Sequence, residues 1–443
     1  MEGVTQCIGH FPSSVLPTVC SDYPLRFVAI ILVCAVWLQC AAGTVRYRAV
    51  AIEDPFGTNG LNTNTVYSIA EDISDSGLVT GQAQTTAVSQ WAGFDTLFIY
   101  EIRTGFLAFE GVPGYGTRGI GINNSGQIAV SAGQTNGEKV FRYSPGVGFQ
   151  DLGTLGATNR FSRHVAYRIN SSGQVVGHSA LLDGSYHAFR YTDEIGMEDL
   201  GTLGGSFSSA IDINDLGWVC GKSLLADGSQ HAFLYEEDFG MMDLGPGNGI
   251  AINNQGVIAG VVGGKPVLFR DGLVVPIPFP YGLNTSYGVG SINEGNIVVG
   301  GILISFPKGG GSERAVIVSE SFGVIELETM IPTNSGWRLW AAIGINNHGQ
   351  IVGEGSFRGK HTAFLLNPIP PVLRIDRSGS RIVLNWSSPW SGVVLETTTN
   401  LSPPLWAPIP LGTNTTVTLP PINTSRFFRL NLDALRGLCC APQ

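Results

Sequence analysis

The chain has 443 residues, of which 60 are glycine, 43% are hydrophobic and 13% are charged, and its formal net charge is -9. The many turn residues, without long stretches of helical periodicity, exclude a helical solenoid. The acidic balance and the lack of a basic cluster argue against nucleic acid as a partner and against a polybasic membrane-binding segment.

An apolar run over residues 27–38 follows Arg26 and leads into small residues that end at Gly43. The run is too short to span a bilayer comfortably and is typical of a secretory signal. We therefore expect residues 1–43 to be a signal peptide, cleaved near Ala42, and the protein to be secreted or on the cell surface, in an extracellular or periplasmic location. The 25 residues before the run are long for a signal, so an uncleaved N-terminal anchor, which would hold the chain at a membrane, is the alternative.

One phrase recurs seven times downstream: an apolar residue, usually Ile, then Asn, then a polar turn that ends in Gly and an apolar pair. Five copies begin at Ile122, Ile169, Ile213, Ile252 and Ile345; looser ones begin at Ile73 and at Ile292, the latter one residue shorter. The turn glycines are 39 to 54 residues apart, the size of a four-stranded unit. We predict structural turns at Asn123, Gly126, Asn170, Gly173, Asn214, Gly217, Asn253, Gly256, Asn293, Gly295, Asn346 and Gly349.

Each repeat has the pattern of four short antiparallel strands. One copy consists of the β-branched or aromatic segments 165–170, 174–179, 187–191 and 196–200, separated by Gly, Asn and Asp. Four such strands are typical of a propeller blade. The last repeat has three strands before Pro368, and the alternating segment 44–52 is suited to supply the fourth and close a ring. We therefore predict an all-β fold in which residues 44–367 form a seven-bladed β-propeller, with six blades, eight blades or a right-handed β-helix as alternatives.

The remaining C-terminal residues predict a second, smaller domain. Residues 368–371 form a Pro-rich linker, and residues 372–433 contain six short segments of period two, typical of a small β-sandwich. We expect residues 434–443, which include Cys439 and Cys440, to be a disordered tail. Cys220 takes the place of Ala or Val in other repeats, which predicts a core position.

Several phrases resemble a known family. His187-Ala-Phe-Arg-Tyr, His231-Ala-Phe-Leu-Tyr and His361-Thr-Ala-Phe-Leu, with Asp151-Leu-Gly-Thr-Leu-Gly and Asp199-Leu-Gly-Thr-Leu-Gly-Gly, resemble the bacterial extracellular HAF repeat family over about residues 65–367. The stretch 395–401 and Arg426-Phe-Phe-Arg-Leu are similar to a terminal β module of exported proteins from Verrucomicrobia. These resemblances imply a fold and an exported location, and they imply no established activity.

The repeated polar residues favour structural roles. The repeated Asn, with Asp215 and Glu294, offer oxygens of the kind that bind Ca²⁺, but most copies are neutral, and an Asn that caps its own turn explains the repetition. The histidines 187, 231 and 361 occupy equivalent places in different repeats, so we expect hydrogen bonds between strands and no shared metal. We predict no cofactor and no metal site.

The sequence contains no Gly-x-Ser-x-Gly elbow, no His-Glu-x-x-His and no phosphate-binding glycine loop. Acids such as Asp193, Glu194 and Glu236 to Asp238 fall in turns, and the insertion from Ser305 to Arg314 has the composition of a flexible loop. We predict a non-enzymatic scaffold that binds a glycan or a protein through loops on one propeller face, with no ligand-binding residue identified. The alternative is an extracellular polysaccharide hydrolase or lyase, whose channel carboxylates would converge within about 5 to 10 Å.

Overall fold

The computed structural model describes most of the repeat region and the core of the C-terminal module. The described residues are 31–33, 47–52, 65–85, 95–102, 104–108, 115–134, 137–158, 162–279, 285–305, 311–320, 322–369, 373–378, 381–386, 394–399, 406–409, 416–419 and 426–431. The predicted cleavage near Ala42, linker residues 370–371 and the tail 434–443 lie outside them.

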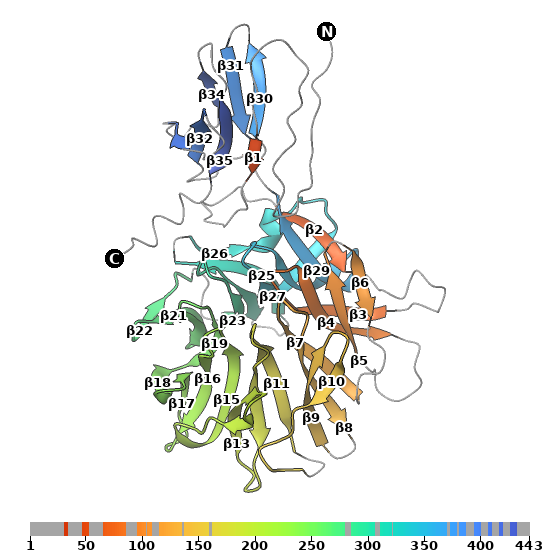
Figure 1. Cartoon of the computed structure of the whole chain (residues 1–443), viewed down its shortest axis with the longest axis vertical. Helices are drawn as coiled ribbons and strands as arrows, with labels where there is room; N and C mark the ends of the chain where they lie inside the picture. The colour runs from red at the N-terminus through yellow and green to blue at the C-terminus, as the bar shows by residue number, and fades with distance from the viewer. Residues whose placement is uncertain are drawn as a thin grey trace. The chain divides into compact units, whose positions relative to one another are not determined.

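The described chain is all-β apart from one short 3₁₀ helix, so the all-β part of the predicted fold class is confirmed. It divides into a large unit that contains the repeats and a small unit from residues 1–33, 373–386 and 394–431 (Figure 1). No helix in the described ranges has the length and apolar composition needed to cross a membrane.

Six runs of four consecutive strands make up most of the large unit, and each run is antiparallel in chain order. The first three runs are β3 (Thr65–Ile73), β4 (Leu78–Thr85), β5 (Asp95–Glu101) and β6 (Gly105–Ala108); β7 (Tyr115–Ile122), β8 (Ile128–Gln134), β9 (Gly137–Ser144) and β10 (Gly148–Asp151); and β11 (His164–Ile169), β12 (Val175–Ala180), β13 (Tyr186–Thr192) and β14 (Gly196–Asp199). The next three are β15 (Gly204–Ile213), β16 (Val219–Leu225), β17 (Gln230–Glu236) and β18 (Gly240–Pro246); β19 (Asn248–Ile252), β20 (Ile258–Val262), β21 (Lys265–Arg270) and β22 (Leu273–Pro276); and β23 (Thr285–Ile292), β24 (Val298–Ser305), β25 (Gly311–Ser319) and β26 (Gly323–Glu326).

The last sheet combines strands from both ends of the repeat region. After the 3₁₀ helix η1 (Leu327–Met330) come β27 (Trp337–Ile345), β28 (Ile351–Phe357) and β29 (Lys360–Pro368). The fourth strand is β2 (Tyr47–Ile52), which pairs antiparallel with β29 from Tyr47 opposite Pro368 to Ile52 opposite Ala363. The N-terminal segment and the last repeat are therefore hydrogen-bonded in one sheet.

The first strand of every repeat carries a β-bulge at the same place. The ladder shifts at Glu71, Ile120, Tyr167, Ile211, Ile250, Gly290 and Ile343, each two residues before the repeated Ile. A bulge bends its strand and increases its twist. The repeat thus encodes a local distortion as well as a turn.

A glycine lets the first two strands of a repeat approach closely. A Cβ added to Gly177 would lie 1.8 Å from the carbonyl oxygen of Val165 and 2.8 Å from the ring of Phe189. Gly81, Gly221, Gly260, Gly300 and Gly353 are equally crowded by the backbone of the neighbouring strand. This crowding explains the glycine that ends the Val-Val-Gly part of the repeat.

Apolar side chains fill the space between consecutive sheets. Val176 and Ala188 of the third run of strands pack with Ala210, Ile213 and Phe233 of the fourth, all buried, and a parallel bridge between Tyr186 and Phe207 also joins these two runs. Cys220 is also fully buried, in a cluster with residues of the following sheet, which agrees with its predicted core position.

Two predictions of local structure are corrected. Ser305 of the expected flexible loop ends strand β24, and residues 311–314 belong to strand β25, which pairs with β24. The Ile292 copy is not one residue shorter, because Asn296 closes its turn with a φ of 57° and donates its N–H to the carbonyl oxygen of Asn293. Asn tolerates the left-handed conformation, so it replaces the usual Gly there, and Gly295 lies one position earlier.

The small unit contains two sheets. One consists of β30 (Leu373–Ser378), β31 (Arg381–Trp386) and β34 (Thr416–Leu419); the other consists of β1 (Ile31–Val33), β35 (Phe427–Asn431), β32 (Val394–Thr398) and β33 (Ala407–Pro408). Each of the six segments of period two predicted within residues 372–433 overlaps one of the strands β30 to β35. β1 lies within the apolar run of the predicted signal and pairs in parallel with β35.

Candidate functional site

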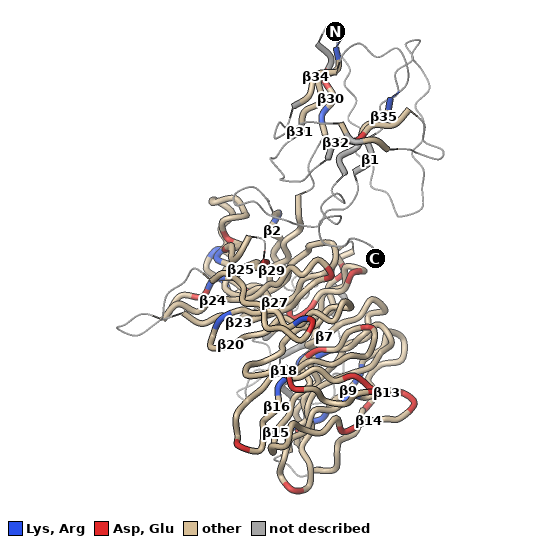
Figure 2. Tube along the Cα trace, turned by 90° about the vertical axis from the view of Figure 1, so that its left-hand side faces the viewer, with Lys and Arg blue, Asp and Glu red and all other residues tan. Residues whose placement is uncertain are grey.

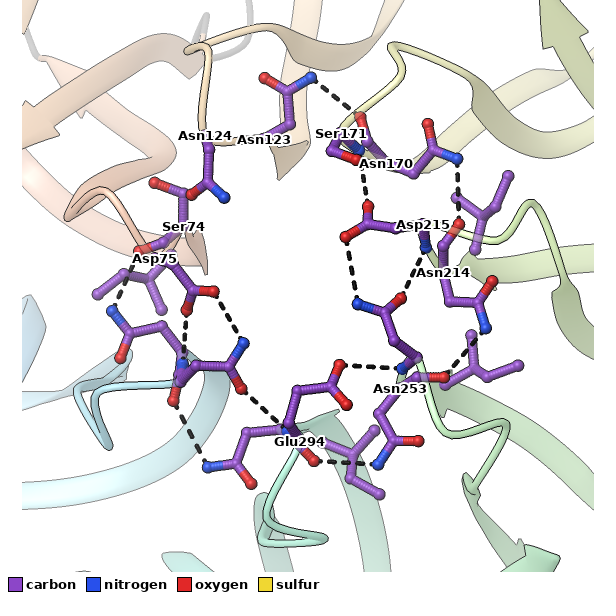
Figure 3. Close-up of a pocket in the computed structure, with 18 of the residues that line it drawn as sticks. Ser74, Asp75, Asn123, Asn124, Asn170, Ser171, Asn214, Asp215, Asn253 and Glu294 are labelled. Atoms are coloured by element: carbon purple, nitrogen blue, oxygen red, sulfur yellow. Dashed lines mark hydrogen bonds between the residues drawn. The ribbon is translucent and has the colours of Figure 1, made fainter. Parts of the chain in front are cut away.

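The repeated turns meet around one small polar cavity of about 170 Å³ (Figure 3). Each of the seven repeats contributes its apolar residue and the next two residues to the lining. The first of the two polar positions is Ser74, Asn123, Asn170, Asn214, Asn253, Asn293 and Asn346, and the second is Asp75, Asn124, Ser171, Asp215, Asn254, Glu294 and Asn347. We call this arrangement the turn ring.

Each Asn at the first position caps its own turn. The side-chain oxygen of Asn214 accepts hydrogen bonds from the backbone N–H groups of Leu216 and Trp218, both at 3.0 Å. The same two bonds recur at Asn123, Asn170, Asn253, Asn293 and Asn346. This geometry is the capping role that the sequence favours.

The other end of the same side chains joins one repeat to the next. The amide nitrogen of Asn170 donates to the backbone oxygen of Asn214 at 3.0 Å, and Asn214 donates to Asn253 at 3.0 Å. Asn123, Asn253, Asn293 and Asn346 make the corresponding bond, the last of them to Ser74. Sequence reasoning missed these contacts, because nothing local shows which backbone oxygen faces an amide.

The second polar position of the turn ring adds another set of contacts between repeats. The backbone N–H of Ser171 donates to Asp215 at 2.9 Å, that of Asn254 to Glu294 at 2.9 Å, and that of Asn347 to Asp75 at 2.6 Å. Burial raises the pKa of Glu294, the N–H of Asn254 opposes this, and the nearby charges of Asp215 and Asp75 raise it further. The carboxylates of Asp215, Glu294 and Asp75 thus accept hydrogen bonds from backbone N–H groups, and these bonds compete with the binding of a cation.

Charged side chains at the residue before the repeated Ile also join first strands. The carboxylate of Asp212 accepts the N–H groups of Ile213 and Ile252, both at 2.9 Å. Asp72 accepts those of Ile73 and Ile122 in the same way, at 2.9 and 3.0 Å.

Arg168 occupies the same position in the repeat that directly precedes that of Asp212. Its guanidinium donates to the backbone oxygen of Ile120 at 2.7 Å. Burial raises the pKa of Asp212 to about 6, although the charge of Arg168 and two backbone hydrogen bonds lower it. In the sequence, Asp72, Arg168 and Asp212 each directly precede the repeated Ile. Aligning the repeats would therefore have identified these three charged residues.

The predicted histidines lie in separate repeats, on β13, β17 and β29. His187 bonds to Asp199 at 2.9 Å and His231 to Asp243 at 2.8 Å, each across two neighbouring strands. His361 is not equivalent to them, because it precedes its buried Phe by three residues instead of two. A shift of one residue moves a side chain to the other face of a strand, and His361 pairs instead with Glu354 of β28 at 2.7 Å.

The acidic turns carry ion pairs between sheets. Figure 2 shows acidic residues at the turns beside β13 and β14. Asp193 there accepts a hydrogen bond from the buried Arg142 at 2.6 Å, and Glu237 lies 3.4 Å from the buried Arg190. Some of the turn acids therefore hold neighbouring repeats together.

A larger cavity of about 790 Å³ lies where β24 and β25 face η1 and the start of β27. Two ion pairs line it, Arg314 with Glu326 at 2.6 Å and Arg338 with Glu328 at 2.9 Å. The remaining lining residues are Leu303, Gly311, Ser312, Glu313, Ala315, Thr329, Thr333, Leu339 and Trp340. We call it the β25–β27 cavity.

Comparison with known proteins gives no match to a family model and no match among curated proteins. Among solved structures, TolB from Acinetobacter baumannii is similar at 15% identity over 48% of this chain and 54% of its own, with a TM-score of 0.34. A putative TolB from Agrobacterium tumefaciens is similar at 13% identity over 62% and 98%, with a TM-score of 0.40.

A third similar structure is a puromycin-hydrolyzing peptidase of Mycobacterium tuberculosis, at 10% identity over 73% of this chain and 58% of its own, with a TM-score of 0.47. This chain therefore spans little more than half of the Acinetobacter TolB and of the peptidase.

The two cavities differ in what their side chains are free to do. In the turn ring, the same hydrogen bonds recur from repeat to repeat and engage most of the polar groups within the fold. In the β25–β27 cavity, the charged groups belong to side chains that are partly exposed. Within the described residues, no group of three or more His, Cys, Asp or Glu side chains has an arrangement suited to a metal ion.

Proposed function

We propose that this chain is an exported scaffold of the HAF repeat type that binds an extracellular glycan or protein and does not transform it. Its repeats would form a closed seven-bladed propeller, and residues on one face would hold the ligand. The small C-terminal unit would be a β-sandwich-like module.

The sheet pairings support seven blades and closure. Each of the seven repeat turns connects the first two strands of its own group of four strands. The last group is completed by β2 from the N-terminal side. The hydrogen bond from Asn346 to the backbone of Ser74 links the last turn to the first. A ring leaves no strand edge open at either end of the array, which is why a closed arrangement is favoured.

One observation carries the binding role: the larger cavity lies where the repeat pattern is broken. Polar residues of the turn ring are used by the fold in nearly the same way in every repeat. The β25–β27 cavity has its own residues and partly exposed ion pairs, and loops or irregular units on one face are where repeat proteins bind ligands.

The alternative of a hydrolase or lyase with channel carboxylates is less well supported. Asp72 and Asp212 each accept two backbone N–H bonds, which holds the carboxylates in place between strands. A general acid or a nucleophile needs an oxygen that can reach a substrate. These two acids are better explained as links between neighbouring first strands.

The experiment uses the full purified chain on a glycan array and in polysaccharide pull-downs, followed by a reducing-end assay on each ligand that is retained. Retention without release of reducing ends supports a binding scaffold. Release of reducing ends would overturn the non-enzymatic proposal. Cell fractionation of the native host tests export separately, and a cytoplasmic signal would contradict that part.

A further inference from the structure

We propose that the β25–β27 cavity is a binding site for a neutral, hydroxyl-rich saccharide. The inference rests on the proposed function and assigns its site and ligand class. The volume of about 790 Å³ lies in the range of small-molecule sites. The cavity lies wholly in the large unit, between the sixth run of four strands and the sheet that contains β27.

The repeat is longest at this place. From Asn293 to Asn346 the turns are 53 residues apart, whereas the two preceding intervals are 40 and 39 residues. Part of the extra length is the connection that contains η1, and Glu328 and Thr329 of η1 line the cavity. Insertions in repeat proteins lie in loops on one face, often the binding face.

The repeat also changes its chemistry here. His231 pairs with Asp243 in an earlier sheet, and strand register puts Arg314 and Glu326 at the same two places in the sheet of β25. The exchange replaces an imidazole by a guanidinium, which has five N–H donors in a planar fork. One donor bonds to Glu326, and the arginine side chain stays 44% exposed, so other donors are open to a ligand.

The cavity offers an apolar wall as well. Trp340 lines it, half-buried, and its ring packs at 4.8 Å from that of His361, which restrains the indole. Leu303 lines it with 41% of its surface exposed. A sugar ring has an apolar face of C–H groups, and an aromatic side chain provides a large rigid surface at low entropic cost.

The polar lining suits hydroxyl groups, which both donate and accept. Glu313 and Glu328 provide acceptors, while Arg314 and Arg338 provide donors. The N–H of Leu339 donates to Glu328 at 3.3 Å and orients that carboxylate. Three glutamates against two arginines give the cavity a formal charge of -1, which does not favour an anionic polymer. A neutral saccharide is therefore the class that this chemistry fits.

The test is affinity electrophoresis of the full chain through gels that contain xylan, β-glucan, mannan or dextran, with alginate as the anionic comparison. A neutral oligosaccharide from the polymer that retards the chain is then titrated calorimetrically. We expect Trp340→Ala to weaken the Kd about tenfold or more, because a central aromatic anchor is removed. We expect Arg338→Ala to weaken it about threefold to tenfold through the lost donors.

Two further variants keep the result interpretable. Phe239→Ala removes an aromatic side chain that is 72% exposed in the β17–β18 turn and should leave the Kd unchanged. Arg338 is 77% exposed, so its variant should fold even where Trp340→Ala does not. A thermal melt of each variant monitors folding.

Each other outcome contradicts the inference in a different way. Unchanged affinity in both folded cavity variants would overturn the site while leaving a glycan-binding scaffold in place. Retardation by alginate alone would overturn the neutral class. Retardation by no polymer would overturn the inference, and the scaffold proposal would then depend on whether the chain binds a protein.

Discussion

The side-chain amide of Asn346 donates a hydrogen bond of 3.0 Å to the backbone oxygen of Ser74, 272 residues earlier in the chain. The other bonds of this type join turns that are 39 to 53 residues apart. Contacts between distant residues cost more loop-closure entropy than contacts between neighbours, although the cost grows slowly with length. The same local chemistry therefore serves both neighbouring repeats and the two ends of the array.

Asn346→Asp should destabilise the protein by about 2 to 3 kcal/mol. The substitution keeps the side-chain oxygen that caps the turn, but it removes the buried N–H donor, so the backbone oxygen of Ser74 loses its hydrogen bond. Urea unfolding measures the change. Asn334→Asp, at an exposed turn residue, is the control and should change the free energy of unfolding by no more than about 0.5 kcal/mol. Equal midpoints for Asn346→Asp and the wild type would show that the bond contributes nothing.

Ile52→Ala in strand β2, which pairs with β29, should cost about 2 to 5 kcal/mol, because Ile52 is fully buried and its loss leaves a cavity. Guanidinium unfolding gives the free energy, and light scattering reports association through an exposed strand edge. Arg48→Ala changes an exposed residue of the same strand and should have little effect. If both variants behave alike, β2 does not contribute to a closed ring.

Gly177→Ala should destabilise the fold by about 1 to 3 kcal/mol or more, since its Cβ would meet the Val165 oxygen at 1.8 Å. Gly288→Ala is a matched substitution in another strand, where the nearest atom would be 4.0 Å away. There we expect no loss, or a gain of up to about 1 kcal/mol from reduced entropy of the unfolded chain. Thermal unfolding of the two variants compares them, and similar losses at both sites would refute the steric explanation.

Asp212 should make the stability depend on pH. Burial raises its pKa to about 6, above the ordinary value of 3.8, so folding favours the protonated acid. Its stabilising contribution is complete below about pH 4 and is lost as the pH rises through about 6. Unfolding free energies of the wild type and Asp212→Asn are measured from about pH 3.5 to 7.5, and the wild type should lose stability relative to the variant as the pH rises from about 4 to 6.

Asp227 is a control of the opposite sign. Hydrogen bonds from the hydroxyl and the N–H of Ser229 lower the pKa of this exposed carboxyl. Its contribution is present above the ordinary pKa and is lost only as the pH falls below it. Asp227→Asn should therefore leave the profile between pH 4 and 6 parallel to that of the wild type, and parallel profiles for Asp212→Asn would refute its role.

The sequence by itself determined the strands and most of the turns, because both depend on local chemistry. Segments such as 373–376 alternate apolar and polar residues, and glycines such as Gly126 and Gly173 have the positive φ that their turns require. Asn296 escaped notice because Asn can replace Gly in that conformation.

Only the tertiary structure decided which residues of different repeats meet. The partners of Arg168 and Asp212 are backbone groups of neighbouring strands, and the pairing of Arg314 with Glu326 acquires its setting from η1 and β27. These relationships depend on how repeats stack, on bulges and on strand register, where a shift of one residue turns a side chain such as His361 to the other face. The local sequence determines which polar groups each repeat carries, whereas the stacking of the repeats determines which groups they contact.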